Sequence, residues 1–168
     1  MTNALAVTAP TAGVTLESVP WDLAEVHELR EEQQVELRGR YGQGEPGPPP
    51  TGHGLVAMVL VRVDGEPVAC GAVQDITGEY PDLGHGRIGE IKRVFVRPEA
   101  RRRGLSRLVM AALHEHARDA RLDRLVLETG MLQPEACALY EACGYTLIDN
   151  YGPYVTDPVS LCYALSLT

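Results

Sequence analysis

The sequence lacks the features that would assign it to several large classes of protein. No stretch reaches the roughly 18 consecutive apolar residues of a membrane-spanning helix, and no Lys or Arg precedes Arg30, so no charged segment introduces an apolar signal core. Basic residues are in the minority, and the formal net charge is -8. Proteins that bind nucleic acid phosphates generally need an excess of Lys and Arg. We therefore expect a cytoplasmic protein that binds neither membranes nor nucleic acids.

Patterns for disulfides and metals are also scarce. The sequence has no CxxC pair and no cysteine cluster with histidine, so we expect reduced, mostly buried thiols at Cys70, Cys137, Cys143 and Cys162. Two histidines lie close together in "HEH", which is not the HExxH zinc motif. His116 falls on the apolar stripe of a predicted helix and His114 faces away from it. The sequence therefore predicts no metal site.

What the chain does contain is a succession of strand and helix patterns. Residues 1–13 are small and polar without periodicity, which predicts a loose N-terminal tail, and the full 168 residues are short for two domains, which predicts a single domain over 14–168. Apolar periodicity predicts helices at about 21–40, 103–120 and 134–143, strands at 14–19, 88–97, 124–129, 145–149 and 159–167, and a hairpin within 55–75 that turns at Asp64-Gly65.

Two connections in this pattern indicate where a ligand would bind. A strand, a helix and a strand in succession over 88–129 imply a parallel pair with a crossover helix. The cleft between such a strand end and the next helix start is where α/β proteins usually bind ligands. In the segment 41–54, nine of fourteen residues are Gly or Pro, which predicts a surface loop. Loops of this length often border a binding cleft.

The segment "RRRGLS", residues 101–106, stands at that helix start. Free backbone N–H groups and the positive end of the helix dipole favour an anion there, although a solvated basic turn would look the same. Gly104 allows close approach of a phosphate, and Ser106 adds a hydroxyl. The arginines at 101, 102 and 103 can neutralise a pyrophosphate locally. Because the chain has neither a Walker A motif nor a complete GxGxxG, we expect a cofactor other than an ordinary nucleotide.

Two motifs in order resemble one family. "VFVRPEARRRGLSRLVM" is similar to the acetyl-coenzyme A segment of the GNAT superfamily of N-acetyltransferases, with the pattern strand, Arg/Gln-x-x-Gly-x-Gly/Ala, helix, in which Arg101 and Gly104 take the first two marked places. "PEACALYEACGY" is similar to the later Ala-x-x-Leu-Tyr-x-x-x-Gly-Phe/Tyr helix, matched by Ala136, Leu139, Tyr140, Gly144 and Tyr145. The resemblance extends over about 14–167. It departs from the family at Ser106, at Arg102 and in the missing asparagine before the later helix.

The resemblance implies an α/β fold with a central, mostly antiparallel sheet, a parallel pair at the cofactor cleft and about four flanking helices. It implies an enzyme that transfers an acetyl group from acetyl-coenzyme A to a primary amine by direct attack, without a metal. The implied cofactor-binding residues are Val94, Phe95 and Val96, acting through their main chain, and Arg101, Arg102, Arg103, Gly104, Leu105 and Ser106.

The resemblance also implies roles for three further side chains. Tyr140 would protonate the departing thiolate, although its spacing alone is that of a core tyrosine. Glu90 is the first candidate for the base, and strand alternation predicts that it shares a face with Lys92, Val94 and Val96. A surface carboxylate paired with Lys92 or Arg93 is the alternative. Glu128 is the second candidate, either as the base or as a charge that attracts the amine.

The identity of the acceptor is left open by the sequence. A small-molecule amine is favoured because the loop 41–54 could cover the groove that a protein substrate would need. Acetylation of a protein lysine or N-terminus, and a regulatory module that binds coenzyme A without catalysis, are the alternatives. The last strand could also pair across a homodimer.

Overall fold

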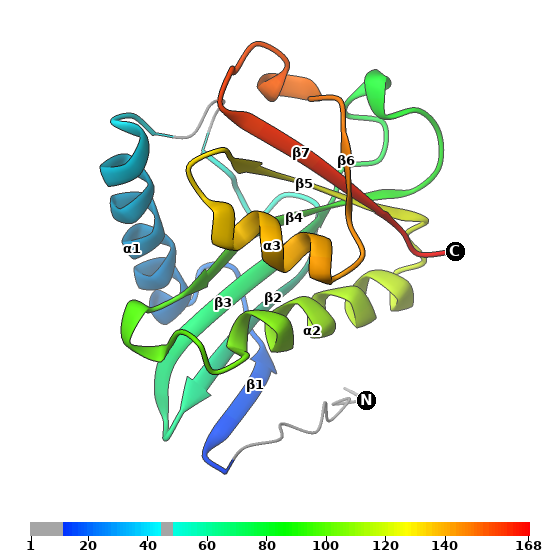
Figure 1. Cartoon of the computed structure of the whole chain (residues 1–168). Helices are drawn as coiled ribbons and strands as arrows, with labels where there is room; N and C mark the ends of the chain where they lie inside the picture. The colour runs from blue at the N-terminus through cyan, green and yellow to red at the C-terminus, as the bar shows by residue number, and fades with distance from the viewer. Residues whose placement is uncertain (1–11, 45–48) are drawn as a thin grey trace.

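The computed structural model describes residues 12–44 and 49–168, which form one mixed sheet with helices on both faces (Figure 1). The strands are β1 (Val14–Ser18), β2 (Leu55–Val63), β3 (Glu66–Asp75), β4 (Ile88–Val96), β5 (Arg124–Gly130), β6 (Thr146–Ile148) and β7 (Ser160–Ser166). The α-helices are α1 (Ala24–Tyr41), α2 (Leu105–Asp119) and α3 (Pro134–Ala142). Residues 1–11 of the predicted tail and residues 45–48 of the predicted loop lie outside the described residues.

The sheet has the order β1-β2-β3-β4-β5-β7-β6, and its neighbours are antiparallel except for β4 and β5. Helix α2 makes the crossover between these two parallel strands, as the sequence predicts. Over the described residues the chain forms three α-helices rather than about four. Short 3-10 turns stand at Pro81–Leu83, Pro98–Ala100 and Gly152–Tyr154. The mixed α/β class is thus confirmed, with one helix fewer than expected.

Two apolar clusters attach the helices to opposite faces of the sheet. On one face Val109 and Leu113 of α2 and Tyr140 of α3 pack with apolar side chains of the central strands. On the other face Val26 and Leu29 of α1 pack with β2, β3 and β4. Burying each aliphatic side chain of this size contributes about 1.5–3 kcal/mol. The sheet therefore fixes α1 on one side and α2 and α3 on the other (Figure 1).

Glycines with positive φ stand at the turns where the sequence predicts them. Asp64 and Gly65 have φ of 50° and 85° and join β2 to β3 in a two-residue hairpin turn. Gly144 has φ of 94° and follows the end of α3. Such backbone is strained for most residues but open to glycine. The hairpin turn predicted at Asp64-Gly65 is confirmed.

A bulge in β4 corrects the predicted alternation of side chains. From Ala72 to Cys70 β3 advances two residues while β4 advances three, from Lys92 to Phe95, and Arg93 has φ of 56°. Because of this extra residue, side chains beyond the bulge lie on the faces opposite to those that strict alternation predicts. Glu90 and Lys92 still share a face. Val94 and Val96 instead lie on the opposite face, in the cluster with α2, so the prediction that all four share a face is wrong.

The same strand parts from its parallel neighbour beyond Glu90. The pairing of β4 with β5 runs only from Ile88 opposite Arg124 to Glu90 opposite Val126. Strand β4 continues to Val96, past its last register partner on β5. The sheet is therefore split at its centre, and the two hollows described next lie at this split.

Candidate active site

A wide cleft of about 610 Å³ lies between the end of β4, the start of α2 and the start of α3. Gly104 stands just before α2 with φ of 75°, and the first helical bond runs from the Leu108 N–H to the Gly104 carbonyl. The N–H groups of the first helical turn therefore lie outside the helix's own bonding, and no side chain caps them. This arrangement favours an anion, such as a pyrophosphate.

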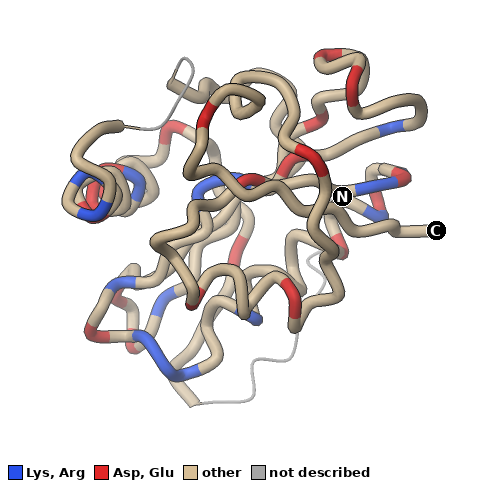
Figure 2. Tube along the Cα trace, turned by 45° about the horizontal axis from the view of Figure 1, so that its top comes forward, with Lys and Arg blue, Asp and Glu red and all other residues tan. Residues whose placement is uncertain are grey.

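Most of the cofactor-binding residues predicted from the sequence line this wide cleft. They are Val94, Phe95, Val96, Arg101, Arg102, Gly104, Leu105 and Ser106. Arg103 is exposed and is not among the lining residues. Acidic and basic residues are interspersed along the described trace (Figure 2).

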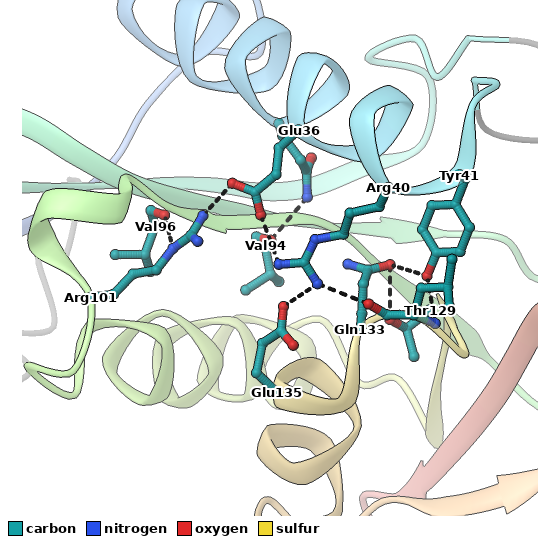
Figure 3. Close-up of polar contacts among 11 residues, drawn as sticks. Glu36, Arg40, Tyr41, Val94, Val96, Arg101, Thr129, Gln133 and Glu135 are labelled. Atoms are coloured by element: carbon teal, nitrogen blue, oxygen red, sulfur yellow. Dashed lines mark hydrogen bonds and ion pairs between the residues drawn. The ribbon is translucent and has the colours of Figure 1, made fainter.

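The Arg101 side chain is engaged with the protein itself. Its Nε donates to the Val96 carbonyl at 2.9 Å, and Nη2 lies 2.5 Å from Glu36 of α1. The guanidinium also lies over the Phe95 ring, 5.7 Å from its centre. In this conformation Arg101 ties the end of β4 to α1 (Figure 3). Arg102 also lines the wide cleft, and no hydrogen bond or ion pair among the described residues ties its side chain to the protein in the way that Arg101 is tied.

A chain of ion pairs joins α1 to α3 beside the wide cleft. Arg40 pairs with Glu36 one turn earlier, at 3.4 Å, and also with Glu135 of α3. Its Nη1 donates to the Leu132 carbonyl at 3.0 Å. Together with the Arg101–Glu36 pair, these contacts connect three elements that are far apart in the sequence (Figure 3).

A narrow cavity of about 120 Å³ adjoins the wide cleft through the split between β4 and β5. Six residues line both hollows, namely Gln33, Leu37, Val94, Gln133, Ala136 and Tyr140. We call this shared boundary the junction. The cavity is further lined by Tyr41, Gln43, Glu90, Lys92, Arg93, Glu128, Tyr154 and Asp157, among others.

Tyr140 lies at the junction and not only in the core. Its side chain is 8 % exposed and packs edge-on against Tyr145, with ring centres 6.0 Å apart. Burial, with the nearby charge of Glu128, raises the pKa of Tyr140 well above its ordinary value. A tyrosine in this state keeps its proton at neutral pH and can give it to a stronger base.

Glu90 is held on both carboxylate oxygens. It is 2 % exposed, accepts a hydrogen bond from the Tyr151 hydroxyl on Oε2, and lies 3.0 Å from Lys92 Nζ through Oε1. Burial and the charge of Glu90 raise the pKa of Tyr151 well above its ordinary value, so the phenol stays a donor. The prediction of a Glu90–Lys92 pair is thus met, but inside the cavity wall rather than at the surface.

Glu128 is the other carboxylate of the cavity, on the same face of the sheet as Glu90. It is half-buried, follows Val126 by two residues on β5, and accepts a hydrogen bond from the Ser160 hydroxyl at 2.9 Å. Strand pairing places Val126 opposite Glu90. The structure therefore brings the three predicted catalytic side chains, Tyr140, Glu90 and Glu128, into the wall of one cavity.

Several lining residues escaped the sequence analysis. Gln133 accepts hydrogen bonds from Tyr41, at 3.1 Å, and from Thr129, at 3.5 Å (Figure 3). This bond network depends on partners about 90 positions apart, which no local pattern reveals. Gln33 had a signal, since it is the polar member of the apolar stripe of α1. Tyr154 had one too, because "YGPY" places aromatics around a turn.

The predicted roles of two histidines need correction. His114, expected to face away from the core, is 9 % exposed and lies 2.9 Å from the Tyr145 hydroxyl through Nε2. Burial lowers its pKa to about 4. His116 is half-buried instead and lies 2.9 Å from the Ser18 hydroxyl. Helical spacing places both residues near the edge of the apolar stripe. His114, which contacts Tyr145, is the one that is buried.

Other groups that could bear chemistry contribute less. The four cysteines are unpaired, with Cys70 and Cys162 buried and Cys137 and Cys143 half-buried. Among the described residues, no three His, Cys, Asp or Glu side chains are grouped to hold a metal ion. Within 12–44 and 49–168, no helix combines the length and hydropathy that a membrane crossing requires. The cytoplasmic location stays a prediction.

Comparisons with known proteins agree with this architecture. A model of the acetyltransferase (GNAT) family matches residues 23–145. A candidate acyl-CoA N-acyltransferase from Klebsiella pneumoniae has a solved structure with a TM-score of 0.74 and 30 % identity, covering 94 % of this chain and 100 % of that one. The chain belongs to the acetyltransferase (GNAT) family.

Two further relatives carry more specific names. The chain is 37 % identical over 107 residues to the "IAA acetyltransferase" of Azospirillum brasilense, a match that covers 63 % of this chain and 65 % of that protein. The chain thus spans just under two thirds of that relative. A GNAT acetyltransferase of Elizabethkingia anophelis, solved with acetyl-CoA bound, shares the fold with a TM-score of 0.64 at 13 % identity, over 93 % of this chain and 99 % of that one.

Proposed function

We propose that the protein is an N-acetyltransferase that moves an acetyl group from acetyl-coenzyme A to the primary amine of a small molecule, with both substrates bound together. The observation that carries this proposal is the junction, where a wide cleft with an anion-binding end meets a narrow cavity walled by carboxylates. Two substrates that enter from opposite sides would meet beside Tyr140. Direct transfer requires such a meeting point.

The wide cleft suits coenzyme A in size and polarity. The start of α2, with Gly104 and Arg102, would hold the pyrophosphate, and β4 beyond the bulge would pair with the pantetheine arm. When bound, acetyl-coenzyme A supplies the thioester that the amine attacks. A main-chain N–H of β4 near Val94 would then polarise the thioester carbonyl, an arrangement that contributes about 3 kcal/mol in enzymes of acyl transfer.

The residues of the narrow cavity suit an amine. Glu128 is half-buried, accepts a hydrogen bond from the Ser160 hydroxyl and lines the cavity, so we assign it the task of taking the proton from the amine, directly or through water. Glu90 has both oxygens engaged, and we assign it the positioning of Lys92 and Tyr151. Tyr140, whose pKa is raised, would give its proton to the departing sulfur.

A small acceptor is supported by the size of the cavity, about 120 Å³, and by the name of the Azospirillum relative. A cavity of this size fits a small group rather than the flanking residues of a polypeptide.

A thiol-release assay tests the proposal. Purified protein with acetyl-coenzyme A would be supplied with tryptamine, spermidine, lysine, methionine and a peptide with a free N-terminus, while calorimetry measures coenzyme A binding. We expect binding and amine-dependent thiol release with a free amine. Release with the peptide alone would show that the acceptor is a polypeptide rather than a small molecule. Coenzyme A binding without thiol release would indicate a regulatory module. No binding at millimolar concentrations would overturn the proposal as a whole.

A further inference from the structure

Gln33 has a buried polar atom that the fold leaves without a partner. The side chain extends from α1 to the sheet, where its Nε2 donates to the Val94 carbonyl at 3.0 Å. Its Oε1 is fully buried and has no hydrogen-bond partner among the described residues. An orphaned acceptor of this kind costs about 1–3 kcal/mol. Such a cost in a well-packed wall calls for an explanation.

The orientation of this carboxamide is fixed by its surroundings. A flip would aim Oε1 at the Val94 carbonyl, oxygen against oxygen, so the donor must face the strand and the acceptor must face elsewhere. Gln33 lines both the wide cleft and the narrow cavity. The residue that carries the orphaned oxygen therefore lies at the junction, where the reacting groups of both substrates would meet.

The other polar side chains of the junction, Gln133 and Tyr140, differ from Gln33 in their hydrogen bonding and protonation. Gln133 Oε1 already accepts hydrogen bonds from Tyr41 and Thr129. The Tyr140 hydroxyl is a protonated donor. Gln33 Oε1 is thus the side-chain carbonyl oxygen of the junction that has no hydrogen bond within the described residues. Its complement is an N–H group.

We propose that Gln33 Oε1 accepts a hydrogen bond from the attacking amine and thereby positions it for transfer. This inference rests on the proposed function. A neutral amine has two N–H groups and one lone pair; with one N–H on Gln33, the lone pair is left to face the acyl carbon. The N–C bond forms as the C–S bond breaks, the nitrogen loses one proton toward Glu128, and the sulfur gains one from Tyr140. Gln33 exchanges no proton and acts through geometry.

The pantetheine arm, which also carries amide N–H groups, is the competing source of a donor. The two sources separate in binding and kinetics. An acceptor contact affects kcat and the KM of the amine, whereas a pantetheine contact affects the affinity for coenzyme A. The variant Gln33→Met keeps the length of the side chain and removes the oxygen. Gln33→Glu keeps an oxygen and removes the donor to Val94. Val35→Ala, on the exposed side of the same helix, is the matched control.

The experiment uses the full chain and the amine of the panel that the wild-type protein acetylates fastest. For Gln33→Met we expect kcat/KM for that amine to fall about 10- to 100-fold, the range of one lost hydrogen bond to a reacting group, while the dissociation constant of coenzyme A stays within about twofold. Gln33→Glu keeps an acceptor oxygen but sets its other oxygen against the Val94 carbonyl, so it should recover only a small part of the loss, and Val35→Ala should match the wild type.

Three results would overturn the inference. A weaker affinity of Gln33→Met for coenzyme A, with an unchanged KM for the amine, would assign the oxygen to the pantetheine arm. An unchanged kcat/KM in both variants at position 33 would leave Gln33 a packing residue. If the wild-type protein acetylates no amine, the proposed function falls first and this inference with it. Circular dichroism of each variant separates a lost fold from a lost contact.

Discussion

In the proposed function, the wide cleft and the narrow cavity would recognise their ligands by different means. The cleft offers backbone groups at the start of α2 and along β4, together with the side chain of Arg102. The cavity is walled by side chains from α1, β4, β5 and the segment before β7, and it has about a fifth of the volume. Backbone recognition suits a constant donor, because it tolerates changes of side chain. Side-chain recognition leaves the acceptor to be set by individual substitutions.

The largest expected effect lies where the two hollows meet. Tyr140→Phe removes the proton donor while keeping the ring, so kcat should fall about 100-fold or more, the usual range for a lost general acid. Affinity for coenzyme A should change little. Stopped-flow thiol release and calorimetry measure the two quantities. A kcat within about threefold of the wild type would show that Tyr140 is a core residue and does not act as the acid.

The two carboxylates of the cavity should differ from each other. Glu128→Gln should lower kcat about 10- to 100-fold with little loss of stability, because Glu128 is half-buried and the amide oxygen of Gln can still accept from the Ser160 hydroxyl. Glu90→Gln should chiefly lower the free energy of unfolding, by about 1–3 kcal/mol, because it disturbs a buried hydrogen bond and ion pair. Urea titrations beside kinetics separate these effects. The reverse pattern would make Glu90 the base.

The arginines of the wide cleft should also differ from one another. The double substitution of Arg102 and Arg103 by Ala should weaken coenzyme A binding by about 1–3 kcal/mol, the value of lost charge-assisted bonds. Arg101→Ala should act more on stability, because its guanidinium joins Val96 and Glu36. Calorimetry at two salt concentrations tests this, since phosphate contacts weaken with salt. Equal losses of affinity in both proteins would show that Arg101 turns toward the ligand.

The smallest expected effect is on stability and comes from His114, which contacts Tyr145 next to Tyr140. His114 is neutral in the folded protein because burial lowers its pKa from 6.5 to about 4. The unfolded chain therefore binds more protons between these values, so this contribution to stability is present above pH 6.5 and is lost as the pH falls toward 4. The free energy of unfolding should drop by about 1 kcal/mol between pH 7 and 5.5. His114→Gln should flatten this slope, and His116→Gln should not.

The sequence predicted most of the fold because its signals were local. Asp64-Gly65 marked a turn that needs positive φ, and Pro134 marked the start of the predicted helix at 134–143. Strict alternation failed in β4, since the bulge at Arg93 depends on pairing with β3. The arginine turn could be found from a motif within six residues. Tyr140, Glu90 and Glu128 of the cavity wall were also predicted, but partners such as Tyr151 were not, because Tyr151 and Glu90 meet across 61 positions.

Helix α1 borders both hollows, and this has a thermodynamic consequence. Its residues Glu36 and Arg40 line the wide cleft, and Tyr41 lines the narrow cavity. Gln33 and Leu37 line both. A rigid displacement of this one element would reshape both volumes at once. If a ligand in the cleft then changes the binding free energy of a ligand in the cavity, the second ligand must change the binding free energy of the first by the same amount, because such coupling is reciprocal.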